Sequence, residues 1–280
     1  MPFHDLVFEE AQTVIRMLLR ELDEKSPGVI EDVYIGGSIA LREPHRIHSD
    51  IDLVLIRPED IDNARTMAAL EPVLAWVREM YPKPEIDAIV LSASDLAAGP
   101  DRIEGIRPVI VEGVPELSET GSQRNPVTWA TLQQCGITWR GLPLPNADLW
   151  YDRAALIDWE RRNIDDYWRP WLAMSDHLAS RGGILTFRPY FIEWGVLGIT
   201  RLHATIATGE IFSKYQAGEY GLDHFDERWR HILKEAMRIR SGPNDNGATC
   251  PSLYGRNLLK RRSDARAYIA TVIEDIAGRR

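Results

Sequence analysis

The sequence predicts an α/β (α+β) protein whose first part mixes helices with strands and whose second part is all-helical. The first 91 residues alternate between segments with helical and with strand-like spacing of apolar side chains. After about residue 150, no segment has the short alternation of a strand, and apolar residues recur at helical spacing instead. The Gly- and Pro-containing segment at 141–146 separates the two patterns, so we expect domains at 1–150 and 151–280.

The elements of the first part follow from the periodicity of its apolar residues. Residues 5–23 place apolar side chains at helical spacing with Glu and Arg between them, which predicts an amphipathic helix. Residues 98–126 are rich in Gly, Pro and acidic residues, and we assign no regular element to them. The other expected elements are strands at 31–35, 51–56, 86–91 and 137–140 and helices at 62–80 and 127–135.

The second part is expected to be a helical bundle or cap. Its tryptophans Trp159, Trp168, Trp171 and Trp194 fall within expected helices, where large aromatic side chains typically pack in a core or between domains. The basic run at 256–266 is short and is offset by acids elsewhere, so we expect it to form a solvated helix face. The expected helices are 152–179, 189–209, 226–240 and 253–277.

Composition and charge exclude several classes of protein. The formal net charge is −9 and there is no basic stripe, which argues against a polynucleotide partner. Cys135 and Cys250 lack the spacing of a thiolate metal site or a disulfide framework. The N-terminus lacks the pattern of a signal peptide, and no stretch is long enough to span a bilayer. We therefore expect a cytoplasmic protein without nucleic-acid or membrane partners.

The most informative stretch runs from Gly-Gly-Ser at 36–38 to Ser-Asp-Ile-Asp at 49–52. Side chains alternate across a strand, so Asp50 and Asp52 point to the same face. Two adjacent carboxylates repel one another unless a cation lies between them, and Mg²⁺ prefers oxygen ligands and often binds substrate phosphates as well. Asp is also depleted in strands, so this pair indicates a metal site.

A phosphate-binding segment and a third carboxylate complete the pattern. Glycines let the backbone come close to a phosphate, and Ser38 at the start of a helix offers a hydroxyl and an amide. Asp87 opens the strand expected at 86–91, and a neighbouring strand would bring it beside the first pair. Nucleotidyl transfer with two metal ions needs more than two carboxylates.

Each of these motifs alone has an ordinary structural explanation. An Asp-x-Asp pair is most often a solvated strand edge or a turn, and Gly-Gly-Ser is most often a loop. In this order and spacing, with a third acid opening a later strand, the motifs together favour a metal-dependent phosphate site.

In this pattern the chain resembles the DNA-polymerase-β-like nucleotidyltransferase superfamily, on the strength of Gly37-Ser38, Ser49-Asp50-Ile51-Asp52-Leu53 and the later acid Asp87. Within that superfamily, the second half is similar to the aminoglycoside adenylyltransferases that modify streptomycin and spectinomycin. In the stretch LGITRLHATIATGEIFSK at 197–214, a helix bearing Arg201 ends at Thr-Gly, and a Ser-Lys pair ending at Lys214 follows. The resemblance covers residues 30–95 and 194–222.

The resemblance implies a fold and a reaction. The fold is an N-terminal nucleotidyltransferase domain with a mixed sheet and a C-terminal all-α helical domain, with the active site in the cleft between them. The reaction transfers AMP from ATP to a hydroxyl group and releases pyrophosphate. The implied roles are Mg²⁺ binding by Asp50, Asp52 and Asp87, general-base catalysis by Asp87, triphosphate contacts from Gly37, Ser38 and Ser49, and phosphate contacts from Arg201 and Lys214.

Two further observations favour a phosphate-binding role for Arg201 and Lys214 over that of ordinary surface charges. Arg201 lies on a largely apolar helix, where an unpaired charge is costly. Lys214 follows the helix stop at Thr208-Gly209, which places it on a loop in this interpretation. Glu193 is the next candidate for the general base if Asp87 does not serve.

The chain departs from the resembled family at three points. Its third acid is Asp87, where the family's streptomycin adenylyltransferases carry Glu, and the loop between Ser38 and Asp50 is one residue longer. The family's acidic and aromatic positions before the Arg-bearing helix do not match the stretch FRPYFIEW at 187–194. The acceptor of the family therefore does not carry over residue by residue.

Two functions remain open on the sequence. The first is an enzyme that uses ATP to adenylylate a small cationic or hydroxylated acceptor, such as an aminoglycoside or aminocyclitol, and so confers antibiotic resistance. The second is a nucleotide-binding regulatory or antitoxin-type protein of the same fold without drug-modifying activity. The three intact acids favour the enzyme, and the acidic balance argues against an enzyme that extends a polynucleotide.

Overall fold

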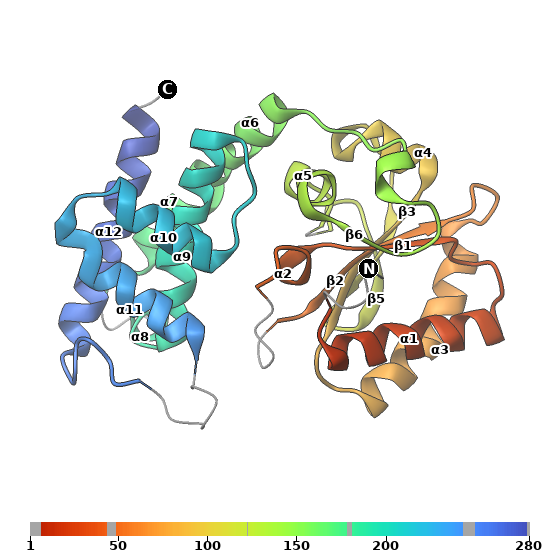
Figure 1. Ribbon diagram of the computed structural model, residues 1–280, viewed down its shortest axis with the longest axis horizontal. Helices are drawn as coiled ribbons and strands as arrows, with labels where there is room; N and C mark the ends of the chain where they lie inside the picture. Colours follow the sequence, from red (N-terminus) through yellow and green to blue (C-terminus); the bar gives the residue numbers. More distant parts are fainter. Residues whose placement is uncertain (1–6, 44–48, 122, 178–180, 243–249, 279–280) are drawn as a thin grey trace. The chain divides into compact units, whose positions relative to one another are not determined.

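The computed structural model describes residues 7–43, 49–121, 123–177, 181–242 and 250–278. The start of the helix expected at 5–23 and the end of the one expected at 152–179 lie outside these ranges. The chain divides into two compact units, unit 1 at residues 1–153 and unit 2 at residues 154–280 (Figure 1). Each unit has a hydrophobic core of its own.

Unit 1 contains a six-stranded sheet in the order β5-β4-β3-β2-β1-β6. β2 and β3 run parallel and all other neighbours are antiparallel, so the sheet is mixed and the predicted fold class is confirmed. The strands are β1 (Asp32–Ile35), β2 (Ile51–Arg57), β3 (Ile86–Ser92), β4 (Arg107–Val111), β5 (Val114–Ser118) and β6 (Ile137–Arg140).

Side chains of the central strands pack on both faces of the sheet, because these strands are apolar on both sides. Leu53 and Leu55 belong to the core that α1 and α3 cover, and these two helices lie side by side (Figure 1). Val54 and Ile56 point to the opposite face, where they pack with Trp129 of α5. The helices of unit 1 are α1 (Glu9–Lys25), α2 (Gly37–Ala40), α3 (Asn63–Met80), α4 (Ala93–Ala98) and α5 (Pro126–Cys135), with short 3₁₀ turns η2 (Pro100–Arg102) and η3 (Leu144–Asn146).

The strands β4 and β5 form a hairpin within 98–126, the segment to which the sequence pattern assigned no element. Its two-residue turn consists of Glu112 and Gly113, whose φ angles are 50° and 73°. Positive φ at both positions is what a type I′ hairpin turn requires. Glu-Gly is a weaker signal for this turn than Asn-Gly or Asp-Gly, which is why the spacing alone does not reveal the hairpin.

Unit 2 is all-helical, as predicted, and is built around α9. Buried residues such as Val196, Leu197 and Ile199 line α9, and α10, α11 and α12 pack against it. No helix in the described ranges of the chain is long and apolar enough to cross a membrane. The elements are α6 (Arg153–Asn163), a π-helical turn η4 (Ile164–Trp168), α7 (Arg169–Met174), α8 (Arg181–Leu185), α9 (Pro189–Thr208), α10 (Lys214–His224), a 3₁₀ turn η5 (Glu227–Trp229), α11 (Arg230–Ser241) and α12 (Leu258–Gly278).

The tryptophans of unit 2 take part in packing, as predicted. Trp168 and Trp171 are buried in the core of the unit. Trp168 also stacks on Trp194 of α9, with their ring centroids 5.0 Å apart. These contacts hold the π-helical turn and α7 against α9.

The basic run at 256–266 is only in part the solvated helix face that was expected, because Arg256 and Lys260 are exposed but two other arginines are not. Arg261 and Arg262 of α12 are buried. Arg262 donates hydrogen bonds to Oγ1 of Thr186 and to the carbonyl oxygen of Ser175. These partners precede α9 in the chain, so the guanidinium groups tie α12 to that segment. Sequence periodicity does not reveal this burial because the partners are distant in the chain.

Candidate active site

Asp52 and Asp87 lie side by side on the two parallel central strands. They are Cα partners in the register of β2 and β3. Paired residues of neighbouring strands project to the same face of a sheet. Both carboxylates therefore lie on the face of Val54 and Ile89, which is opposite to the face covered by α1 and α3. The strand register, and not only the motif, brings the two acids together.

Asp50 lies directly before β2 and is half-buried. Burial raises the pKa of its carboxyl group, and the negative charges of Asp87 and Glu85 raise this pKa further. The aspartates thus concentrate negative charge that a cation would offset. Among the described residues, the oxygens of Asp50, Asp52 and Asp87 are not all within 4.8 Å of one another, so binding of one ion by all three requires a side-chain rotation.

Gly36 and Gly37 bring the backbone against Asp52. The amide of Gly36 donates a hydrogen bond to the carbonyl oxygen of Asp52 at 2.9 Å. Gly37 has a φ angle of 56°, and a Cβ atom at this position would lie 1.7 Å from Oδ2 of Asp52. A side chain at Gly37 is therefore incompatible with the position of this carboxylate. The glycine also allows a close approach to the backbone, as the predicted phosphate-binding role requires.

Ser38 and Ser49 flank the carboxylates along the chain. Ser38 is half-buried in the short helix α2, which starts at Gly37. Ser49 is buried immediately before Asp50. The contacts of both serines with a triphosphate stay predictions.

Two contacts to the carboxylates come from segments without a sequence signal. The backbone amide of Glu112, in the β4–β5 turn, donates a hydrogen bond to Oδ1 of Asp87 at 2.7 Å. The side-chain amide of Gln123, in the loop before α5, lies 3.5 Å from Oδ1 of Asp52. Both contacts join residues far apart in the chain, so no local spacing indicates them.

Lys214 is the first residue of α10 and does not lie on a loop as expected. Ser213 caps this helix: its hydroxyl accepts a hydrogen bond from the amide of Gln216, and the Gln216 side chain accepts one from the amide of Ser213. This reciprocal pair is a capping box, and the Ser-x-x-Gln spacing is its sequence signal. The helix therefore restarts soon after Gly209, the αL residue that ends α9.

Lys214 belongs to a charge cluster with Glu193 and Arg240. Nζ of Lys214 lies 3.1 Å from Oε1 of Glu193, and Nη1 of Arg240 lies 3.7 Å from the same oxygen. Burial lowers the pKa of Lys214, and the charges of Arg201 and Arg240 lower it further, while Glu193 opposes the shift. The positive charges of Lys214 and Arg240 would favour binding of an anion near this cluster. Glu193 is a poor candidate for a general base because its carboxylate already forms two ion pairs.

Arg201 is exposed, which differs from the apolar environment expected for it. Its charge acts on Glu160 of α6, whose carboxyl group is buried. Burial raises the pKa of Glu160 to about 7, and the positive charge of Arg201 opposes this rise. A carboxyl group that titrates near neutral pH is a functional candidate, and sequence reasoning missed it because Glu160 has the spacing of an ordinary helical acid.

We expect Glu160→Gln to stabilise the protein at a pH above about 7. Because folding raises the pKa of Glu160 from 4.5 to about 7, the folded chain favours the protonated carboxyl group. The stability of the wild type relative to the variant is therefore greatest below pH 4.5 and falls as the pH rises to about 7. The total change should be on the order of 3 kcal/mol, measured by chemical denaturation across this range.

The control for this experiment is Asp158→Asn, a change at an exposed acid of the same helix. It should show no comparable trend with pH. A stability difference between the wild type and the Glu160→Gln variant that does not depend on pH would contradict the raised pKa.

The helical unit matches a known protein family. Residues 167–252 match the family model for aminoglycoside adenylyltransferase, C-terminal domain. Unit 2 is therefore similar to the C-terminal domain of the aminoglycoside adenylyltransferases. The matched segment includes α9 and α10 and therefore contains Arg201, Lys214 and Glu193. The cluster of Lys214, Glu193 and Arg240 thus lies within the matched segment.

The fold of the chain is also that of a solved enzyme structure. The structure of spectinomycin adenyltransferase AAD(9) from Enterococcus faecialis with ATP and spectinomycin is 14% identical, with a TM-score of 0.55. The match covers 94% of this chain and 99% of that one. No curated protein matches the sequence. Together with the domain match, this fold confirms the predicted resemblance and the prediction of a nucleotidyltransferase enzyme.

Proposed function

We propose that the protein transfers AMP from ATP to a hydroxyl group of an aminoglycoside or aminocyclitol antibiotic in a Mg²⁺-dependent reaction. The observation that carries this proposal is the pairing of Asp52 with Asp87 on adjacent parallel strands, with Gly37 against the first of them. The C-terminal domain match and the fold shared with AAD(9), which was solved with ATP and spectinomycin, support it.

In the proposed reaction, the acceptor hydroxyl oxygen attacks the α-phosphorus of ATP. A bond forms between these two atoms, the bond from the α-phosphorus to the oxygen bridging to the β-phosphorus breaks, and pyrophosphate leaves with the bonding electrons. The proton of the hydroxyl passes to Asp87 as the general base. The hydrogen bond from the amide of Glu112 to Oδ1 of Asp87 orients this carboxylate, so Oδ2 is the proposed proton acceptor.

The remaining carboxylates and the glycine loop would bind the metal ion and the phosphates. Asp50 and Asp52, with Asp87, would hold Mg²⁺, whose charge offsets that of the phosphate oxygens when it is bound. Carboxylate oxygens suit this hard cation, and it would offset the negative charges of Asp87 and Glu85, which add to the effect of burial in raising the pKa of Asp50. Gly37 would let the triphosphate approach the backbone, and Ser38 and Ser49 would donate hydrogen bonds to it.

A pyrophosphate-release assay with ATP and Mg²⁺ tests the proposed reaction. The acceptor panel contains streptomycin, spectinomycin, further aminoglycosides and simpler polyhydroxylated amines. We expect release only when both Mg²⁺ and one of the antibiotics are present. Binding of ATP without pyrophosphate release for any acceptor would instead favour the nucleotide-binding regulatory or antitoxin-type protein.

We expect Lys214→Ala to weaken ATP binding, because we propose that Lys214 and Arg201 bind phosphate oxygens of ATP. A hydrogen bond to a charged group contributes about 1.5–3 kcal/mol, so the Kd should rise by about tenfold or more. Isothermal titration calorimetry with MgATP measures this change. Lys234→Ala removes an exposed lysine of α11 and is the matched control. An unchanged Kd in both Lys214→Ala and Arg201→Ala would show that these residues do not bind the triphosphate.

A further inference from the structure

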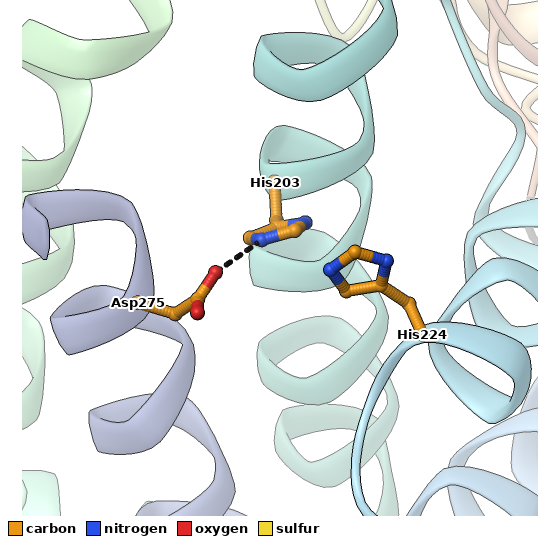
Figure 2. A group of neighbouring side chains, drawn as sticks. All are labelled: His203, His224 and Asp275. Atoms are coloured by element: carbon orange, nitrogen blue, oxygen red, sulfur yellow. Dashed lines mark hydrogen bonds and ion pairs between the residues drawn. The ribbon is translucent and has the colours of Figure 1, made fainter. Parts of the chain in front are cut away.

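A group of metal-ligand side chains lies within unit 2, on three different helices. His203 comes from α9, His224 is the last residue of α10, and Asp275 comes from α12 (Figure 2). Each offers one imidazole nitrogen or carboxylate oxygen, and these atoms all lie within 4.8 Å of one another. Within the part of the chain that the structure describes, this is the one group of at least three His, Cys, Asp or Glu side chains with such spacing.

His203 is held by contacts at both of its ring nitrogens. Nε2 lies 2.8 Å from Oδ2 of Asp275, and Nδ1 lies 3.0 Å from the hydroxyl oxygen of Tyr220 (Figure 2 shows the first contact). With the proton on Nε2, this nitrogen donates to Asp275 and Nδ1 accepts from Tyr220. With the proton on Nδ1, the same nitrogen donates to Tyr220, and the lone pair of Nε2 faces Asp275. The second tautomer is that of a metal-binding histidine whose other nitrogen is hydrogen-bonded.

His203 is also shielded from solvent on the side of the core. Its side chain is buried, and the rings of Tyr220 and Phe225 lie beside it, with centroid distances of 5.7 and 4.9 Å. A buried imidazole with fixed ring orientation loses little conformational freedom when it binds an ion. The hydrogen bonds and the aromatic packing therefore prepare His203 as a ligand.

His224 adds a second imidazole on the exposed side of the group. Its ring stacks on Tyr220 with centroids 5.0 Å apart and an interplanar angle of 11°, and its centroid lies 4.9 Å from that of His203. Bonds from zinc to nitrogen or oxygen ligands are about 2 Å long, so ligands of one ion lie closer together than 4.8 Å. His224 is exposed and Asp275 is only partly buried, so rotation of these two side chains can close the remaining gap.

We propose that His203, His224 and Asp275 bind one Zn²⁺ ion, with water in the fourth position. Two imidazoles and one carboxylate form a known set of protein ligands for zinc with an open position. The ion would join α9, α10 and α12. Because α9 also carries Arg201 and α10 begins with Lys214, the ion would hold together the helices that present these two cations. The proposal does not depend on the proposed transferase reaction.

Calorimetric titration of the chelator-treated, full-length chain with Zn²⁺, in excess Mg²⁺ to occupy the carboxylates of unit 1, tests this site. We expect one Zn²⁺ per wild-type chain. His224→Ala should weaken binding by about tenfold or more, since even the loss of an outer-shell partner has an effect of this size. Asp275→Asn should weaken it as well. His231→Ala removes an exposed histidine of α11 outside the group and should bind like the wild type.

Thermal unfolding provides a second readout. An ion that binds only the folded chain raises the Tm, so a given concentration of Zn²⁺ should raise the Tm of the wild type and of the His231→Ala variant more than that of His224→Ala. His224 is exposed, so its replacement is not expected to unfold the chain. Absence of Zn²⁺ binding to the wild type, or binding of equal strength to the wild type and the His224→Ala variant, would overturn the proposal.

Discussion

Asp52→Asn is expected to abolish Mg²⁺-dependent transfer while the chain stays folded. Asn has nearly the same shape as Asp, so the packing of this side chain against Gly37 is kept. The change removes one negative charge from a group in which Asp50 and Asp87 already repel one another. Metal ions contribute several kcal/mol to such transfers, so turnover should fall on the order of a thousandfold or more.

Turnover of the Asp52→Asn variant is measured as pyrophosphate release under saturating ATP and acceptor. Asp60→Asn, at an exposed acid after the far end of β2, is the matched control and should keep wild-type turnover. A Tm at or above that of the wild type would show that the variant is folded. Wild-type turnover in a folded Asp52→Asn variant would remove this residue from the site.

Asp87→Asn is expected to reduce turnover far more than it weakens ATP binding. A positioned general base contributes about 100-fold to 10,000-fold to the rate, and an amide cannot accept the proton of the acceptor hydroxyl. The hydrogen bond from the amide of Glu112 can be kept by the side-chain oxygen of Asn. ATP binding, measured by calorimetry with Mg²⁺, should therefore change much less than kcat.

The Asp87→Glu variant, which has a longer side chain but keeps the carboxylate, is the matched comparison for Asp87→Asn. Asp87→Glu keeps a base and introduces the residue that the resembled streptomycin adenylyltransferases carry, so it should retain far more activity than Asp87→Asn. If the Asn variant turns over like the wild type, the base lies elsewhere, and Glu160, with its raised pKa, becomes the next residue to replace.

The fold class and the three aspartates proposed for the site both follow from local features of the sequence. Asp50, Asp52 and Asp87 are recognisable because the side-chain period of a strand and the position of each acid at a strand start are local properties. The helices around α9 are recognisable for the same reason, since helical spacing and the helix stop at Gly209 are local signals. The start of α10 at Lys214 also has a local signal, the Ser-x-x-Gln capping box. The prediction of a loop at Lys214 overlooked this signal.

Which of these residues meet depends on contacts between elements that are distant in the chain. The register that pairs Asp52 with Asp87 depends on parallel strands joined through α3, and no spacing within either strand specifies it. The same holds for the hairpin turn that places the amide of Glu112 on Asp87, for the burial of Arg262, and for the approach of His203 to Asp275 across α9 and α12. Each is a contact between residues far apart in the chain, and its geometry follows from how the elements pack and not from local spacing.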